Sequence, residues 1–284
     1  MTFQDFKFKE NLQKAIDEAG FKEPSPIQID AIPHILLGKD IVGQAHTGTG
    51  KTAAFGLPVL NQLTGKNAEA VVIVPTRELA MQVSDELFKF GKFLGINTAT
   101  VYGGQSYSRQ LKLIETASVI VATPGRFLDL LKNEHIKIKP KFVILDEADE
   151  MLDMGFLDDI KDIFTYLPED RQTLLFSATM PTAIKNLAKT ILKEPEFVTI
   201  TKSDVTNKNI TQTFYVVDEK ERDDALIRLF DYKNPKKSII FCRTKKDVDR
   251  LSTFLLSQGF MAKSLHGDME QKQREEAIKA FKTS

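Results

Sequence analysis

The stretch AHTGTGKT at residues 45–52 follows the short apolar run Ile41-Val42 and precedes an apolar segment with helical spacing. Glycines in such a loop let the backbone turn its amides toward a phosphate, and the N-terminus of the following helix adds a positive dipole. The Lys51 amine would reach the β and γ phosphates of a nucleotide, and the Thr52 hydroxyl would join the shell of a magnesium ion. We expect phosphate contacts from Thr47, Gly48, Thr49, Gly50, Lys51 and Thr52.

The loop departs from the strict pattern at Ala45, where glycine is usual, so a glycine-rich structural turn is the alternative. A second cluster, Asp146-Glu147-Ala148-Asp149, directly follows the apolar run 142–145. At the carboxyl edge of a parallel sheet, Asp146 can face the metal beside Thr52, and Glu147 can orient or deprotonate an attacking water. Alone, such a cluster is typical of a solvated helix start. Together with the loop it predicts a magnesium-dependent nucleoside triphosphatase.

Short apolar runs recur between longer segments of helical spacing. Continuous rather than alternating apolar residues indicate strands that are covered on both faces, as in a parallel sheet with helices on each side. The sequence therefore predicts an α/β fold. The expected strands lie at residues 41–42, 71–74, 119–121, 142–145, 174–176, 197–200, 214–217 and 239–241.

Length and composition limit the classes of protein to consider. A chain of 284 residues suggests two domains, and the polar stretch near residue 204 lacks any periodicity. We expect an N-terminal domain at 1–203, a linker at 204–211 and an incomplete C-terminal domain at 212–284. Basic and acidic residues number 39 each, which excludes a global basic field, so phosphate contacts must come from local clusters and backbone amides.

The cysteine count and the apolar runs indicate the cellular compartment of the protein. A single cysteine, Cys242, excludes a disulfide framework and a cysteine-rich zinc site. The N-terminal residues show no secretory pattern, and no apolar run approaches the ~20 residues of a membrane helix. We therefore expect a soluble, cytoplasmic protein that does not associate with membranes.

With D-E-A-D at residues 146–149, the sequence resembles the DEAD-box RNA helicases of superfamily two over nearly its whole length. The resemblance implies a RecA-like parallel sheet with helices on both faces, a partial second RecA-like domain, and ATP with magnesium as ligands. The family's phosphate loop also begins with alanine. Residues 20–28 resemble its Q motif, in which Gln28 would hydrogen-bond the adenine edge and Phe21 would stack on the ring. Phe3 is the isolated upstream aromatic of that motif, although both phenylalanines are also typical core residues.

Three segments resemble the RNA-contacting segments of the family's first domain. Glycines permit close approach of a backbone, helix N-termini bind phosphates, and arginines supply charge. Helix capping and turn formation are the alternative for each segment alone. The expected RNA contacts are Pro75, Thr76, Arg77, Gly103, Gly104, Thr123, Pro124, Gly125 and Arg126.

Ser177-Ala178-Thr179 resembles the family motif that couples nucleotide state to RNA unwinding, with hydroxyls that can hydrogen-bond Asp149. The resemblance thus implies a catalytic set of Lys51, Asp146, Glu147, Ser177 and Thr179. In the second domain, residues 239–244 resemble a conserved strand in which Cys242 would be a core residue. Gln271 and Arg274 match a Q-x-x-R segment that contacts RNA.

The family resemblance implies an ATP-dependent RNA helicase that unwinds short RNA duplexes or remodels RNA–protein complexes, largely independently of sequence. The family's later C-terminal motifs, including its arginine finger, do not occur before Ser284, so we expect nucleotide binding with little RNA-stimulated hydrolysis. A DNA helicase or translocase and a non-catalytic nucleotide-dependent RNA-binding fragment are the alternatives. We expect a monomer, with ribosome-assembly or RNA-decay proteins as candidate partners.

Overall fold

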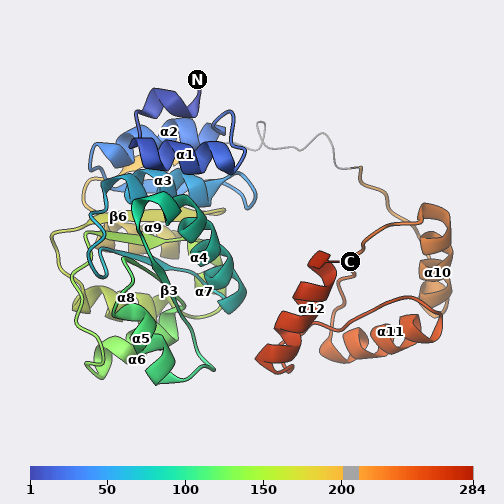
Figure 1. Cartoon of the computed structure of the whole chain (residues 1–284). Helices are drawn as coiled ribbons and strands as arrows, with labels where there is room; N and C mark the ends of the chain where they lie inside the picture. The colour runs from blue at the N-terminus through green and yellow to red at the C-terminus, as the bar shows by residue number, and fades with distance from the viewer. Residues whose placement is uncertain (201–210, 284) are drawn as a thin grey trace. The chain divides into compact units, whose positions relative to one another are not determined.

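The computed structural model describes residues 1–200 and 211–283, and Figure 1 shows the course of the chain. The chain divides into two compact units, residues 1–207 and 208–284. Of the expected linker, residues 204–210 lie outside the described residues.

The first unit is built on one parallel sheet with the strand order β3-β4-β2-β5-β6-β1-β7. Parallel neighbours require crossover connections, and these carry the helices. The predicted α/β fold is confirmed, and every strand expected before residue 200 is present. The strands are β1 Ile41–Gln44, β2 Ala70–Ile73, β3 Thr98–Val101, β4 Val119–Ala122, β5 Phe142–Leu145, β6 Gln172–Ser177 and β7 Glu196–Thr199.

Two hydrophobic cores, one on each face of the sheet, explain the continuous apolar runs. Successive residues of a strand point to opposite faces, so Val72 and Ile144 pack into one core while Val71 and Val143 pack into the other. The first core is closed by η1 Phe3–Phe6, α1 Glu10–Glu18, α2 Pro26–Leu36, α3 Lys51–Gln62 and α4 Arg77–Gly91, with η2 Lys92–Leu94. The second is closed by α5 Tyr107–Ile114, α6 Pro124–Lys132, α7 Ala148–Asp153, α8 Leu157–Tyr166 and α9 Thr182–Ile191.

Strand β3 was not among the expected strands. Its sequence, Thr-Ala-Thr-Val, alternates polar and apolar residues, and only Ala99 and Val101 are buried. The strand lies at an edge of the sheet, where one face is half-exposed. An edge position removes the continuous apolar signal on which the prediction depended.

The described part of the second unit consists of helices α10 Arg222–Lys233, α11 Lys245–Ser257 and α12 Gln271–Thr283, with the 3-10 helix η4 Glu219–Glu221. The strands expected at 214–217 and 239–241 are not formed, and Phe214, Val216 and Phe241 are 87%, 92% and 92% exposed. That prediction was wrong. A strand needs a neighbouring strand to satisfy its backbone hydrogen bonds, and residues 211–283 form no strand that could pair with either segment. Cys242, expected in a core, is half-buried. Among the described helices, none combines the length and apolar character that a bilayer span requires.

Candidate active site and nucleic-acid interface

The strand order divides the expected site residues of the first unit into two groups. All loops that follow the parallel strands leave the sheet at its carboxyl edge. The loops after the adjacent strands β5, β6 and β1 carry the acidic cluster, residues 177–179 and the phosphate loop. The loops after the adjacent strands β3, β4 and β2 carry the three segments expected to contact RNA. We call these sets the β1–β5–β6 loops and the β2–β3–β4 loops.

The phosphate loop has the backbone that its glycines permit. Gly48 and Gly50 have φ values of +85° and +87°, and α3 begins directly afterwards at Lys51. A side chain at either position would be strained in this left-handed conformation. The loop therefore ends on a free helix N-terminus, which is suited to a phosphate.

Lys51 is a buried cation at this edge. Its side chain is 5% exposed, and Nζ lies 3.7 Å from Asp146 Oδ1. No hydrogen-bond acceptor for this ammonium occurs within residues 1–200 and 211–283. Since an ammonium carries three N–H donors, this buried group fits an incoming phosphate oxygen.

Asp146 and Glu147 lie against the phosphate loop, so the structure brings the acidic cluster and the loop together, as the sequence predicted. Thr47 Oγ1 donates to Glu147 Oε1 at 3.2 Å, and Glu147 N donates to Asp146 Oδ1 at 3.0 Å. Burial raises the pKa of Asp146 to about 6, although the Lys51 ammonium opposes this shift. Glu147 has φ +56°, an uncommon conformation outside glycine that turns the chain directly from β5 into α7.

Asp149 connects the end of β5 to the end of β6. Its carboxylate accepts from Thr179 N and Oγ1, each at 2.9 Å, and its backbone N–H donates to Ser177 Oγ at 3.1 Å. Burial would raise the pKa of Asp149, but hydrogen bonds from Thr179 and Ser177 outweigh it and leave the pKa below its ordinary value. The carboxylate is thus held charged between the two strand ends.

Gln28 braces the phosphate loop from α2. Its side chain is 2% exposed, Nε2 donates to Gly50 O at 3.1 Å, and Oε1 accepts from Ser25 N at 2.8 Å. Ser25 Oγ donates to Thr49 O at 2.8 Å. The role of Ser25 was missed, although its spacing to Gln28 is that of a capping box, a signal that could have revealed it.

Phe21, in the Q-motif segment, and Phe3 belong to one aromatic cluster. Phe21 is half-buried, with ring centroids 5.9 Å from Phe3 and 5.6 Å from Phe90. Phe3 is only 2% exposed and its ring packs against that of Phe21, so it also has the core role considered as its alternative, and its contact with a nucleotide stays a prediction. Phe21 retains an exposed fraction through which it can meet a ligand.

The β2–β3–β4 loops bring two arginines onto one glycine-rich turn. A Cβ atom at Gly104, where φ is +88°, would lie 2.9 Å from Arg77 Nη1, so this guanidinium lies directly on the turn. Arg126 Nη1 donates to the carbonyl oxygen of Gln105, the residue after Gly104, at 3.0 Å. Two helix N-termini border the turn, since α4 begins at Arg77 and α6 at Pro124. Cations and helix N-termini at one edge suit an anionic backbone.

Other expected RNA contacts differ in accessibility. Pro75, Thr123 and Pro124 are buried, whereas Gly125 is exposed. Thr76 caps α4 by accepting from Leu79 N at 3.2 Å, so it also has the capping role considered as its alternative. In the second unit, Gln271 and Arg274 lie three residues apart at the start of α12, spacing that places them on one helix face.

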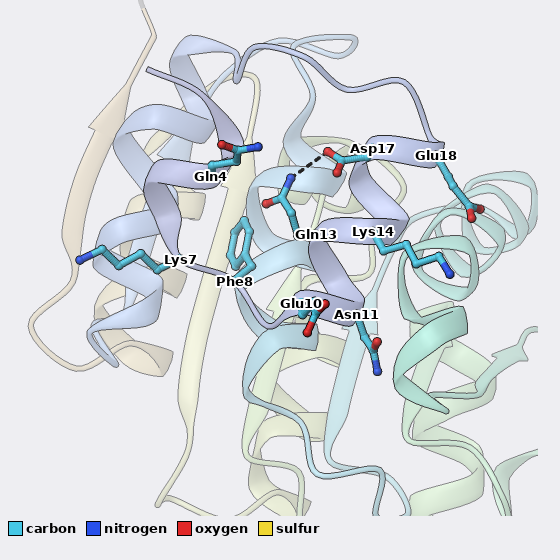
Figure 2. Close-up of a pocket in the computed structure, with 9 residues that line it drawn as sticks. All are labelled: Gln4, Lys7, Phe8, Glu10, Asn11, Gln13, Lys14, Asp17 and Glu18. Carbon is cyan, nitrogen blue, oxygen red and sulfur yellow. Dashed lines mark hydrogen bonds between the residues drawn. The ribbon is translucent and has the colours of Figure 1, made fainter.

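A hollow of about 700 Å³ lies beside η1 and α1, and Figure 2 shows its polar rim, including the hydrogen bond from Gln13 to Asp17. None of its lining residues belongs to the two loop groups. Its lining is mostly long polar side chains at the surface, and we assign it no role.

A RecA-like α/β unit that presents a phosphate loop, an acidic strand end and a serine–threonine strand end defines a nucleotide-binding protein of the P-loop class. The chain belongs to the DEAD/DEAH box helicase family, whose profile matches residues 25–187. The profile of the helicase conserved C-terminal domain matches residues 221–284.

The relatives agree with this membership. The chain is 56% identical to the DEAD-box ATP-dependent RNA helicase RhpA of Helicobacter pylori, covering 99% of this chain and 58% of RhpA. It is 46% identical to the DEAD-box ATP-dependent RNA helicase CshA of Bacillus subtilis, again covering 99% of this chain and 58% of the relative. The chain therefore spans less than two thirds of these relatives.

Two solved structures share the fold. A DEAD box protein from Methanococcus jannaschii is 40% identical with a TM-score of 0.68, covering 100% of this chain and 77% of that one. Saccharomyces cerevisiae Dbp5 bound to RNA and ADP BeF3 is 32% identical with a TM-score of 0.88, covering 99% of this chain and 73% of that one.

Proposed function

We propose that the protein acts as a DEAD-box ATP-dependent RNA helicase, which unwinds short RNA duplexes or remodels RNA–protein complexes as it hydrolyses ATP. Residues 1–284 by themselves would bind nucleotide and RNA with little RNA-stimulated hydrolysis. The observation that carries the proposal is the division of one sheet edge into the β1–β5–β6 loops, suited to a nucleotide, and the β2–β3–β4 loops, suited to a nucleic-acid backbone. Part of the same proposal is that the protein is a cytoplasmic monomer, with ribosome-assembly or RNA-decay proteins as candidate partners.

The β1–β5–β6 loops would bind ATP. Residues 47–52 would hold the phosphates, with Lys51 supplying a desolvated positive charge. Glu147 would orient or deprotonate the attacking water, and its bond to Thr47 keeps it beside the loop. Phe21 and Gln28 would receive the adenine, and the bonds of Gln28 to the loop would tie base recognition to the loop's conformation.

Magnesium would be held by Thr52 and Asp146, partly through water, and would neutralise charge on the phosphates. No group of three or more His, Cys, Asp or Glu side chains able to hold a metal occurs in the described part of the chain. Such a sparse protein shell fits Mg²⁺, which usually keeps several waters and takes further ligands from phosphates. Asp146, buried opposite Lys51, supplies the carboxylate.

The β2–β3–β4 loops would bind RNA through its sugars and phosphates. Arg77 lies against Gly103 and Gly104, Arg126 donates to the carbonyl of the next residue, Gln105, and Gly125, directly before Arg126, is exposed. Gln271 and Arg274 of the second unit would add contacts. Backbone contacts of this kind carry little sequence information, which agrees with sequence-independent remodelling. Ser177 and Thr179, bonded to Asp149, would transmit the state of the nucleotide site.

The direct test compares the chain with Lys51→Ala, using Lys112→Ala, an exposed lysine of α5, as the matched control. We expect the chain and the control to bind a fluorescent ATP analogue with magnesium and to bind single-stranded RNA more tightly when ATP is present. Lys51→Ala should lose both effects. Competition by unlabelled RNA but not DNA would separate this proposal from a DNA translocase. RNA binding that depends on ATP without any turnover would instead identify a non-catalytic fragment.

A further inference from the structure

Tyr107, which follows the glycine-rich turn, contacts the side chain of an expected RNA-binding residue. The guanidinium carbon of Arg126 lies 4.2 Å from the centroid of the Tyr107 ring. A guanidinium over an aromatic face is held by a cation–π attraction while its in-plane N–H groups stay able to donate. One of those groups already donates to Gln105 O. Arg126 therefore has a defined plane, set by one ring and one carbonyl.

The Tyr107 ring is itself fixed by contacts from α6 and the segment after it. Its hydroxyl donates to Asp129 Oδ2, and the His135 ring packs against it at 5.7 Å with an interplanar angle of 61°. Asp129 Oδ1 also accepts from Asn133 Nδ2 at 2.8 Å. The hydrogen bond to Asp129 raises the pKa of the Tyr107 phenol, because this bond favours the protonated hydroxyl.

These contacts lie at the surface, with Tyr107 40% exposed. An exposed aromatic ring with an ordered charged partner contributes little to a core, so core packing does not explain the arrangement. The stack joins α5, which follows β3, to α6, which follows β4. It therefore connects two of the β2–β3–β4 loops by side chains alone.

We propose that Tyr107 is a positioning residue for RNA binding, whose ring holds the Arg126 guanidinium in the orientation that meets an RNA phosphate. The inference rests on the proposed function of the β2–β3–β4 loops. Tyr107 acts through Arg126 and does not itself contact the RNA. An arginine left free to rotate must lose that freedom on binding, so removing the ring weakens the complex without removing a charge.

The test is a double-mutant cycle measured as RNA affinity, by fluorescence anisotropy with a labelled single-stranded RNA and a nonhydrolysable ATP analogue. We expect Arg126→Ala to weaken binding about 10-fold and Tyr107→Ala about 3-fold. In the Arg126→Ala background, Tyr107→Ala should have no further effect. Tyr107→Phe keeps the ring and should retain most of the affinity. Tyr166→Ala, a tyrosine of similar exposure on α8, is the matched control.

Salt dependence separates positioning from a general structural role. Arg126→Ala should reduce the slope of log affinity against log salt by about one phosphate contact, and Tyr107→Ala should reduce it in the same direction. Affinity for the ATP analogue alone should stay unchanged in every variant, which reports an intact fold.

Different results would overturn different statements. If Tyr107→Ala weakens binding equally with and without Arg126, the ring contacts RNA itself and the positioning role is refuted. If Arg126→Ala weakens binding but Tyr107→Ala does not, the positioning role is also refuted while the proposed function stands. If neither variant alters RNA binding, the assignment of these loops to RNA fails, and the positioning role fails with it.

Discussion

Replacing Asp146 by asparagine should stabilise the protein in the absence of nucleotide. Asp146 is fully buried, and its pKa is raised from 3.8 to about 6. Each pKa unit corresponds to about 1.4 kcal/mol, so the ionised carboxylate lowers the free energy of unfolding by about 3 kcal/mol at pH 7. Asparagine resembles the protonated Asp146 side chain, which also carries no charge to pair with Lys51. The variant should therefore regain most of this unfolding free energy of about 3 kcal/mol.

The raised pKa determines how this difference in stability varies with pH. Between pH 3.8 and about pH 6 the folded chain binds more protons at Asp146 than the unfolded chain, so stability from this group falls as pH rises. Above that window the loss is complete and constant. The difference between Asp146→Asn and the unsubstituted chain should be about 3 kcal/mol at pH 7 and about half of that at pH 5.

Urea unfolding followed by far-UV circular dichroism measures this difference, because the chain has no tryptophan for fluorescence. Asp158→Asn, at a side chain 92% exposed, is the control and should change stability little at either pH. Adding magnesium and an ATP analogue at 100 times its Kd should raise the stability of the unsubstituted chain by about 2.7 kcal/mol and that of Asp146→Asn by less. A variant that is less stable at pH 7, or a difference independent of pH, would refute the reasoning.

Three further substitutions test other contacts. Gly104→Ala places a Cβ 2.9 Å from Arg77 Nη1 at a left-handed φ. We expect about 1 kcal/mol lower stability in urea unfolding and weaker RNA binding in anisotropy titrations. Unchanged RNA affinity would contradict the prediction. Thr179→Val removes an O–H donor to Asp149. ATP affinity, measured by equilibrium titration, should persist while the ATP-dependent strengthening of RNA binding falls. Equal loss of both would argue against a coupling role for Thr179. Gln28→Ala removes the brace on Gly50 O; ATP affinity should fall about 10-fold by titration, reflecting one buried hydrogen-bond partner, with GTP affinity less affected.

The fold of the first unit was predictable because its buried strands are continuous apolar runs, such as 142–145, that only a sheet covered on both faces can bury. The edge strand β3 was not predictable, because half-exposed Thr98 and Thr100 interrupt its apolar pattern. In the second unit the same apolar signal at 214–217 failed, because a strand is a property of two segments and residues 211–283 provide no partner.

Sequence motifs identified individual residues of the site, but the contacts between residues of different motifs depend on the fold. The sequence alone indicated Lys51 and Asp146, and the structure adds their separation of 3.7 Å and the raised pKa of the carboxylate. The sequence also indicated Arg126. Its stack on Tyr107 joins two helices whose angle and spacing no pattern of residues specifies.

The boundary between the two loop groups is a rigid part of the sheet. Strands β2 and β5 pair directly with Ile73 opposite Leu145, and Asp146 N donates to Ile73 O at 3.0 Å. Every residue of both strands is buried, and close-packed interiors do not deform gradually. The backbone of Asp146 is therefore fixed to the strand that leads to Arg77. Asp149, Ser177 and Thr179 lie on the nucleotide side of this boundary, where their bonds join the ends of β5 and β6 through side-chain hydroxyls. Unlike the β2–β5 pairing, these bonds can change partners without deforming the sheet, so Thr179→Val tests them without altering the boundary.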